Sequence, residues 1–138
     1  MQTQALALIS DRFGRDTLLS LATLEGDRPS VRIVNSYYKD GAFYTVTHAR
    51  SNKIRHLAHC PNVAVCGEWF TAHGIGENIG HPREEKNEAL MHELRAAFAS
   101  WYDNGHTDEN DPDTCILRVR LTDGILFSNG KRYAIDFP

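Results

Sequence analysis

The 138-residue sequence predicts a mainly β protein (α+β), in which six or seven strands form an antiparallel sheet that closes into a small barrel with three flanking helices. Two observations predict this class. Runs of alternating apolar and polar residues recur along the chain, and short turn signals such as Lys39-Asp40-Gly41 join them. Strands joined by such turns become antiparallel neighbours, and closure removes the edges that an open sheet of this length would expose.

Each expected element follows from local periodicity and from Gly, Pro, Asn and Asp punctuation. We expect strands over residues 17–24, 30–38, 43–47, 62–70, 71–79 and 115–121, and a last hairpin formed by 125–127 and 133–137. We expect helices over residues 5–13, 51–60 and 83–102. The third helix begins after Pro82 and is expected to be the longest. The polar, acidic segment 103–113 is expected to be a solvated loop.

Composition narrows the class of function. The net charge of −3 and the pI of about 6.1 argue against a nucleic-acid binder or an anionic-membrane binder, because both need a basic face. Three cysteines at unrelated spacings do not make a disulfide framework, so we expect a reducing, cytoplasmic compartment. We see no signal peptide, no transmembrane segment and no domain boundary, and we expect one domain over residues 1–138.

The helix predicted at 51–60 carries its charges at the unfavourable end. Ser51 is a good N-cap residue, but Arg50, Lys53 and Arg55 crowd the helix N-terminus, where the macrodipole favours anions. Cations beside free backbone N–H groups are accounted for if an anion binds there, most simply a phosphate. This helix start is therefore the first candidate site.

The sequence also resembles a known family, through an ordered set of motifs that spans nearly the whole chain. The matching features are Arg-Pro-Ser-Val-Arg-Ile-Val (28–34), Phe43-Tyr44-Thr45, Ser51-Asn52-Lys53, Cys60-Pro61-Asn62-Val63, a helix ending in Trp101, and Asp111-Pro112-Asp113 before a strand. In these features the chain resembles the pyridoxamine 5'-phosphate oxidase-like proteins, the FMN-binding split barrels, and within them the general-stress-protein-like branch.

The resemblance implies a set of cofactor-binding residues. The phosphate ligands would be Arg32, Ser51, Asn52 and Lys53. The backbone of Arg32, Ile33 and Val34, and that of Tyr44 and Thr45, would lie along the flavin ring and the ribityl chain, with Thr47 close by. Trp69 falls where the family often places a contact from the second subunit. No catalytic side chain and no metal site is expected.

The resemblance also implies a function. We expect a homodimer that binds FMN between its subunits and acts as a flavin oxidoreductase on a small molecule, with NADH or NADPH as electron donor. True pyridoxamine 5'-phosphate oxidase activity is not expected, because the C-terminal pattern of those enzymes fails at residues 131–136. One alternative is a non-catalytic carrier or sensor that binds flavin or haem. Another is an empty barrel that serves as a dimeric scaffold.

Several other side chains admit an ordinary structural role. Trp101 is expected in the core of its helix, and His56 and His59 are expected to face solvent. His48 and His73 are candidates for lining a substrate pocket.

Overall fold

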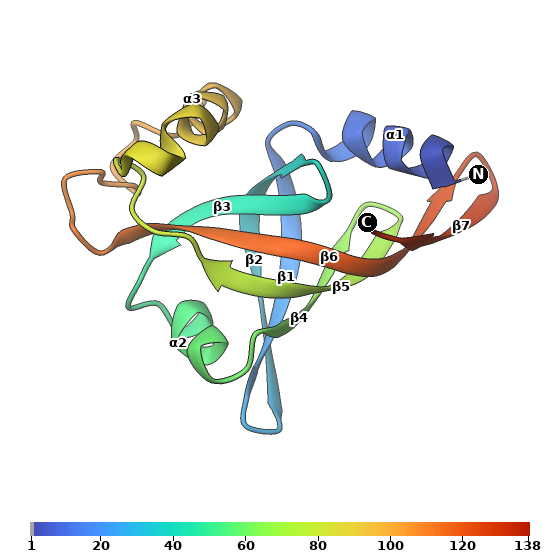
Figure 1. The fold of residues 1–138 in the computed structure, drawn as a ribbon, viewed down its shortest axis with the longest axis horizontal. Helices are drawn as coiled ribbons and strands as arrows, with labels where there is room; N and C mark the ends of the chain where they lie inside the picture. Colours follow the sequence, from blue (N-terminus) through green and yellow to red (C-terminus); the bar gives the residue numbers. More distant parts are fainter. Residues whose placement is uncertain (1) are drawn as a thin grey trace.

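A computed structural model describes residues 2–138 as an antiparallel barrel with three α-helices around it (Figure 1). The elements are α1 (Gln2–Phe13), β1 (Thr17–Glu25), β2 (Arg28–Lys39), β3 (Ala42–His48), α2 (Asn52–His59), β4 (Asn62–Gly67), β5 (Phe70–Asn78), a 3-10 turn (Glu85–Asn87), α3 (Glu88–Ala97), β6 (Thr114–Ser128) and β7 (Lys131–Asp136). No helix within residues 2–138 is long and apolar enough to cross a membrane.

The strands form one sheet that closes on itself. Its order is β3-β2-β1-β4-β5-β6-β7, and additional pairing between β3 and β6 closes the first six strands into a barrel. All of these pairings are antiparallel, and β7 extends the sheet beyond β6. The predicted fold class, a six- to seven-stranded antiparallel split barrel with three helices, is confirmed.

The barrel is split between β2 and β3. These two strands share only three residue pairs, Tyr37↔Tyr44 to Lys39↔Ala42. In contrast, β2 makes nine pairs with β1, and β3 makes seven with β6. The two strands therefore separate before Tyr37 in β2 and after Tyr44 in β3. In these parts each strand has a backbone edge with no strand partner on the side that faces the split.

Aromatic side chains fill the barrel at the α1 end. Phe13 of α1 lies with its ring centroid 5.6 Å from Phe43 and 5.5 Å from Phe70. A second apolar cluster lies outside the barrel, where Met91, Leu94 and Phe98 pack on Ile116.

Three predicted elements were wrong in extent. The strand predicted at 115–121 and the one at 125–127 are a single strand, β6, because pairing of residues 123–126 with β7 continues the strand between them. The predicted helix 83–102 is the 10-residue α3, so α1, with 12 residues, is the longest helix within 2–138. The helix ends at Ala97 and the chain turns there. This turn packs the ring of Trp101 on that of Phe98, with the ring centroids 4.9 Å apart.

The acidic segment 103–113 is anchored rather than freely solvated. Glu109 is only 13% exposed, and its carboxylate accepts hydrogen bonds from Arg95 Nε at 2.9 Å and Nη2 at 2.7 Å. The Tyr102 hydroxyl donates to the same carboxylate at 2.6 Å. The hydrogen bonds from Arg95, and then from Tyr102, lower the pKa of Glu109 from 4.5 to about 2. This carboxylate fastens the segment to the end of α3.

We expect Glu109→Gln to destabilise the protein at pH 7 and to matter less in acid. A depressed pKa in the folded state stabilises the protein above the unfolded pKa, and this stabilisation is lost as pH falls from about 4.5 toward 2. Urea unfolding of both proteins at pH 7, 4.5 and 3 measures the difference in free energy. Glu68→Gln, at an exposed turn, is the control. A difference that stays constant down to pH 3 would contradict this account.

Candidate functional site

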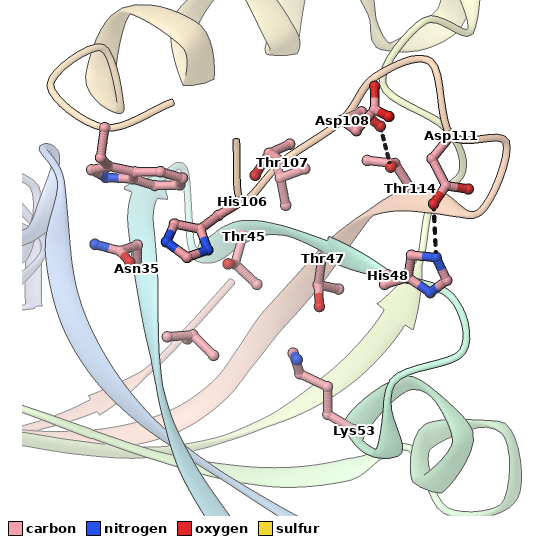
Figure 2. Close-up of a pocket in the computed structure, with 13 residues that line it drawn as sticks. Asn35, Thr45, Thr47, His48, Lys53, His106, Thr107, Asp108, Asp111 and Thr114 are labelled. Carbon is pink, nitrogen blue, oxygen red and sulfur yellow. Dashed lines mark hydrogen bonds and ion pairs between the residues drawn. The ribbon is translucent and has the colours of Figure 1, made fainter. Parts of the chain in front are cut away.

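A cavity of about 340 Å³ lies where β2 and β3 separate. It is lined by Val34 and Asn35 of β2, residues 45–48 of β3, Lys53 of α2, Thr114 at the start of β6, and five residues of the segment between α3 and β6: Trp101, His106, Thr107, Asp108 and Asp111. In Figure 2, Lys53 points into this space from the α2 side, and Asn35 and His106 lie at the opposite end. The cavity is therefore walled by the open edges of two strands, one helix start and one anchored loop.

Lys53 lines the α2 end of the cavity, and a second cation, Arg32, lies near it without being among the lining residues. Burial lowers the pKa of the Lys53 ammonium below 10.5, and the nearby Arg32 guanidinium lowers it further. Within residues 2–138 neither side chain forms an ion pair, although both are partly buried. Partly buried charges are normally paired, so this end of the cavity is suited to an anion.

A buried hydrogen-bond chain holds Arg32 in place. Its Nη1 donates to Thr23 Oγ1 at 2.6 Å, and this hydroxyl lies 2.8 Å from Nδ1 of His56. Thr23 is 1% exposed and His56 is 5% exposed, so the prediction that His56 faces solvent was wrong. The reason is that α2 turns this face onto β1. The Thr23 hydroxyl, which accepts from Arg32 and also hydrogen-bonds His56, thus ties the strand cation to the helix.

The Ser51 hydroxyl is an orphaned buried group at the start of α2. Ser51 occupies the N-cap position, yet its side chain makes no capping hydrogen bond. Its Oγ is buried and has no hydrogen-bond partner within residues 2–138. Asn52 is exposed, and its Oδ1 accepts from Arg55 Nη2 at 2.6 Å. Of the predicted phosphate ligands, Lys53 lines the cavity, and Arg32 lies close enough to lower the pKa of Lys53, but neither Arg32 nor Ser51 is among the lining residues. The side-chain oxygen of Asn52 is engaged by Arg55.

The other predicted contact residues divide into two groups. Val34, Thr45 and Thr47 line the cavity. The Ile33 side chain is 67% exposed and Tyr44 lies in the last paired section, so neither side chain lines the cavity, and their predicted role is one for the backbone.

Trp69 is not brought to the cavity of its own chain. It occupies the turn between β4 and β5 with φ of +53°, is 70% exposed, and lies 6.5 Å from the ring of Phe127. Arg12 of α1 donates to the carbonyl oxygens of Glu68 and Phe127 beside it. A contact from Trp69 to this cavity therefore requires a second copy of the chain.

Two histidines hold in place, through Asp111, the segment between α3 and β6 that forms one wall of the cavity (the loop wall). Nδ1 of His48 accepts the Arg50 N–H, and its Nε2 lies 3.1 Å from Asp111 Oδ2. Nδ1 of His81 accepts the Arg83 N–H, and its Nε2 donates to the Asp111 carbonyl oxygen at 3.0 Å. His48 lines the cavity as predicted. His73 does not; it lies on β5 and pairs with Asp123 at 2.9 Å.

Sequence reasoning missed the residues that the α3–β6 segment contributes. Trp101, expected in the helix core, packs on Phe98 but also lines the cavity, and so does His106. The aromatic residues within a polar stretch were the available signal. Asp111, Asp113 and His48 bring three potential metal ligands within 4.8 Å, but Arg50 already pairs with Asp113 at 3.0 Å, so this is an ion-pair cluster.

Comparison with solved structures supports the fold. General stress protein 26 from Bacillus anthracis str. Sterne superposes with a TM-score of 0.71 at 15% identity, over 95% of this chain and 98% of that one. A FAD-binding protein from Mesorhizobium loti superposes with a TM-score of 0.67 at 16% identity, over 86% of this chain and 91% of that one. A haem-binding protein from Mycobacterium smegmatis superposes with a TM-score of 0.66 at 18% identity, over 88% of this chain and 53% of that one.

At these identities the structural likeness establishes the fold alone. None of the curated proteins matches the chain. The sequence profile described as pyridoxamine 5'-phosphate oxidase matches residues 6–127, which is most of the chain. The chain therefore belongs to the pyridoxamine 5'-phosphate oxidase family.

Proposed function

We propose that this protein is an FMN-dependent oxidoreductase whose cofactor lies in the split between β2 and β3, with its phosphate at the start of α2. Two observations support it: the partly buried cations Lys53 and Arg32 lie near each other without a carboxylate partner among the described residues, and the Ser51 hydroxyl at the N-cap of the same helix is buried without a hydrogen-bond partner. A phosphate monoester carries close to two negative charges and accepts forked, point-charge and backbone donors together. The α2 N-terminus adds free N–H groups and the positive end of its dipole.

The remainder of the cavity suits the rest of the cofactor. Thr45 and Thr47 offer hydroxyls, and the unpaired edges of β2 and β3 offer backbone donors and acceptors. A flavin, when bound, supplies the electron-transfer chemistry, so the protein has to bind, orient and shield it. In keeping with this, the one histidine of β3 in the cavity wall, His48, is committed to Asp111 and Arg50 and is not free as an acid or base.

We further propose a homodimer formed through the outer face of β1 and β2. Leu18, Val31 and Ile33 are 65–70% exposed there, and the register places Ile33 opposite Ser20 and Val31 opposite Ala22 on one face. A contiguous apolar face of this kind marks an interaction surface. Strand β2 carries Arg32 and also lines the cavity. A second copy of the chain on this face would therefore lie beside the cofactor and would bring its own Trp69 toward it.

We also propose a cytoplasmic location, which the three free cysteines support.

We expect Lys53→Ala to weaken FMN binding ten- to a hundredfold, because it removes a charge-assisted contact worth about 1.5–3 kcal/mol. Riboflavin lacks the phosphate and should bind the variant and the wild type alike. Titration of flavin fluorescence measures both ligands. Lys131→Ala makes the same chemical change at the exposed first residue of β7 and serves as the control. Equal losses for FMN and riboflavin would reject the phosphate assignment.

We expect Ile33→Asp to convert the dimer to monomers, because it buries a charge in the apolar contact. The side chain is largely exposed in a single chain, so the fold should survive. Sedimentation velocity measures the mass, and Ala7→Asp, at an exposed position of α1, is the control. A wild-type protein that sediments as a monomer while binding FMN tightly would refute the dimer.

We expect NADH or NADPH to reduce the protein-bound flavin faster than free FMN. Hydride transfer requires the donor to be held against the ring, which a protein site provides and solution does not. Anaerobic stopped-flow absorbance at the flavin band measures the rate. If neither nicotinamide exceeds the rate for free FMN, a flavin or haem carrier or sensor replaces the oxidoreductase, and the absorption spectrum of the purified protein tells those two apart.

A further inference from the structure

One carboxylate fixes two side chains at the end of the cavity opposite Lys53. Asp16, in the link between α1 and β1, accepts from Asn35 Nδ2 at 3.1 Å through Oδ1. Its Oδ2 accepts from the indole Nε1 of Trp101 at 2.8 Å. Asn35 and Trp101 both line the cavity, whereas Asp16 does not. Three segments far apart in the sequence are thus joined behind this wall.

The chemistry of Asp16 dictates what the wall presents to a ligand. A carboxylate only accepts hydrogen bonds, so Asn35 has to turn its NH₂ group toward Asp16 and its carbonyl oxygen the other way. In Figure 2 the nitrogen of Asn35 is turned away from His106, the neighbouring cavity residue. The single N–H of Trp101 is already used, so the indole offers only its apolar ring to the cavity.

The indole is also held against rotation. Its ring lies 4.9 Å from the ring of Phe98 and 5.9 Å from that of Tyr102. An aromatic wall that is fixed on one side by packing and on the other by a hydrogen bond loses little conformational entropy when a flat ring packs against it. The wall therefore combines one fixed acceptor, Asn35 Oδ1, with one fixed apolar plane.

We propose that Asn35 and Trp101 form a ring-recognition subsite for a flat heterocycle that carries an N–H donor on its edge, and that Asp16 is the residue that positions both. The inference rests on the proposed function: with phosphate at Lys53, the other end of the same cavity receives the ring. In a flavin the edge donor is the imide N–H of the pyrimidine ring. Asn35 accepts this hydrogen bond, and a methyl group on that nitrogen abolishes it.

The first experiment compares riboflavin with N3-methylriboflavin, both of which lack the phosphate. We expect the wild-type protein to bind the methylated compound about tenfold more weakly, the effect of one lost hydrogen bond. Asn35→Leu, of similar size, should lower the affinity for riboflavin to the same level and bind both compounds equally. Titration of flavin fluorescence measures all four affinities. Equal binding of the two compounds by the wild-type protein overturns the proposal.

The second experiment tests Asp16 as a positioning residue. In Asp16→Asn, the new amide must accept from Trp101 with its oxygen, so its NH₂ faces Asn35 and turns the Asn35 amide around. A donor then meets the ring N–H, and we expect about tenfold weaker riboflavin binding with no discrimination against the methylated compound. Asp11→Asn, at an exposed position of α1, is the matched control. Discrimination that survives Asp16→Asn removes Asp16 from the proposal.

The outcomes also separate this inference from the proposed function. If FMN binds in a Lys53-dependent manner and the methylated compound binds as well as riboflavin, the subsite is wrong and the phosphate assignment stands. If neither FMN nor riboflavin binds the wild-type protein, both proposals fall.

Discussion

The early separation of β2 from β3 is the constraint on which the candidate site depends. After three residue pairs the two strands part, while the pairing of β3 with β6 keeps the barrel closed. Backbone groups along the two free edges still need partners, because unpaired buried N–H and C=O groups are costly. The cavity between these edges is consequently lined with donors and acceptors from the main chain as well as with side chains, and it lies outside the barrel core rather than within it.

The polar side chains around the cavity are fixed from behind by buried or half-buried partners. Thr23 and His56 hold Arg32 at one end, and Asp16 holds Asn35 and Trp101 at the other. Arg32 and Asn35 both belong to β2 but, being three residues apart, project from opposite faces of the strand: Arg32 lies near Lys53, and Asn35 lines the far end of the cavity. Groups that are already oriented lose less entropy on binding, and this favours a ligand with an anionic tail and a polar ring edge.

The sequence predicted the barrel and the anion end of the site because both have local signatures. Hairpin turns and alternation identify the strands, and misplaced cations such as Lys53 identify the helix start. The wall formed by Trp101 and His106 has no such signature, since its place depends on a contact with Asp16 across 85 residues. The break predicted between residues 121 and 125 was wrong for a related reason: pairing with β7 continues the strand through Asp123 and Gly124. The burial of His56 likewise follows from a distant partner, Thr23.

The segment between β5 and β6 has its own attachments, and this divides the cavity between two parts of the chain. Arg95 and Tyr102 hold Glu109, and His48 and His81 hold Asp111, so this segment is fastened by residues other than those that hold Arg32 on β2 and Lys53 on α2. Sequence change in this segment can therefore reshape the ring end while leaving the anion end intact. In proteins with this barrel, the residues that anchor the cofactor can stay the same while changes in this segment alter which molecules the site accepts.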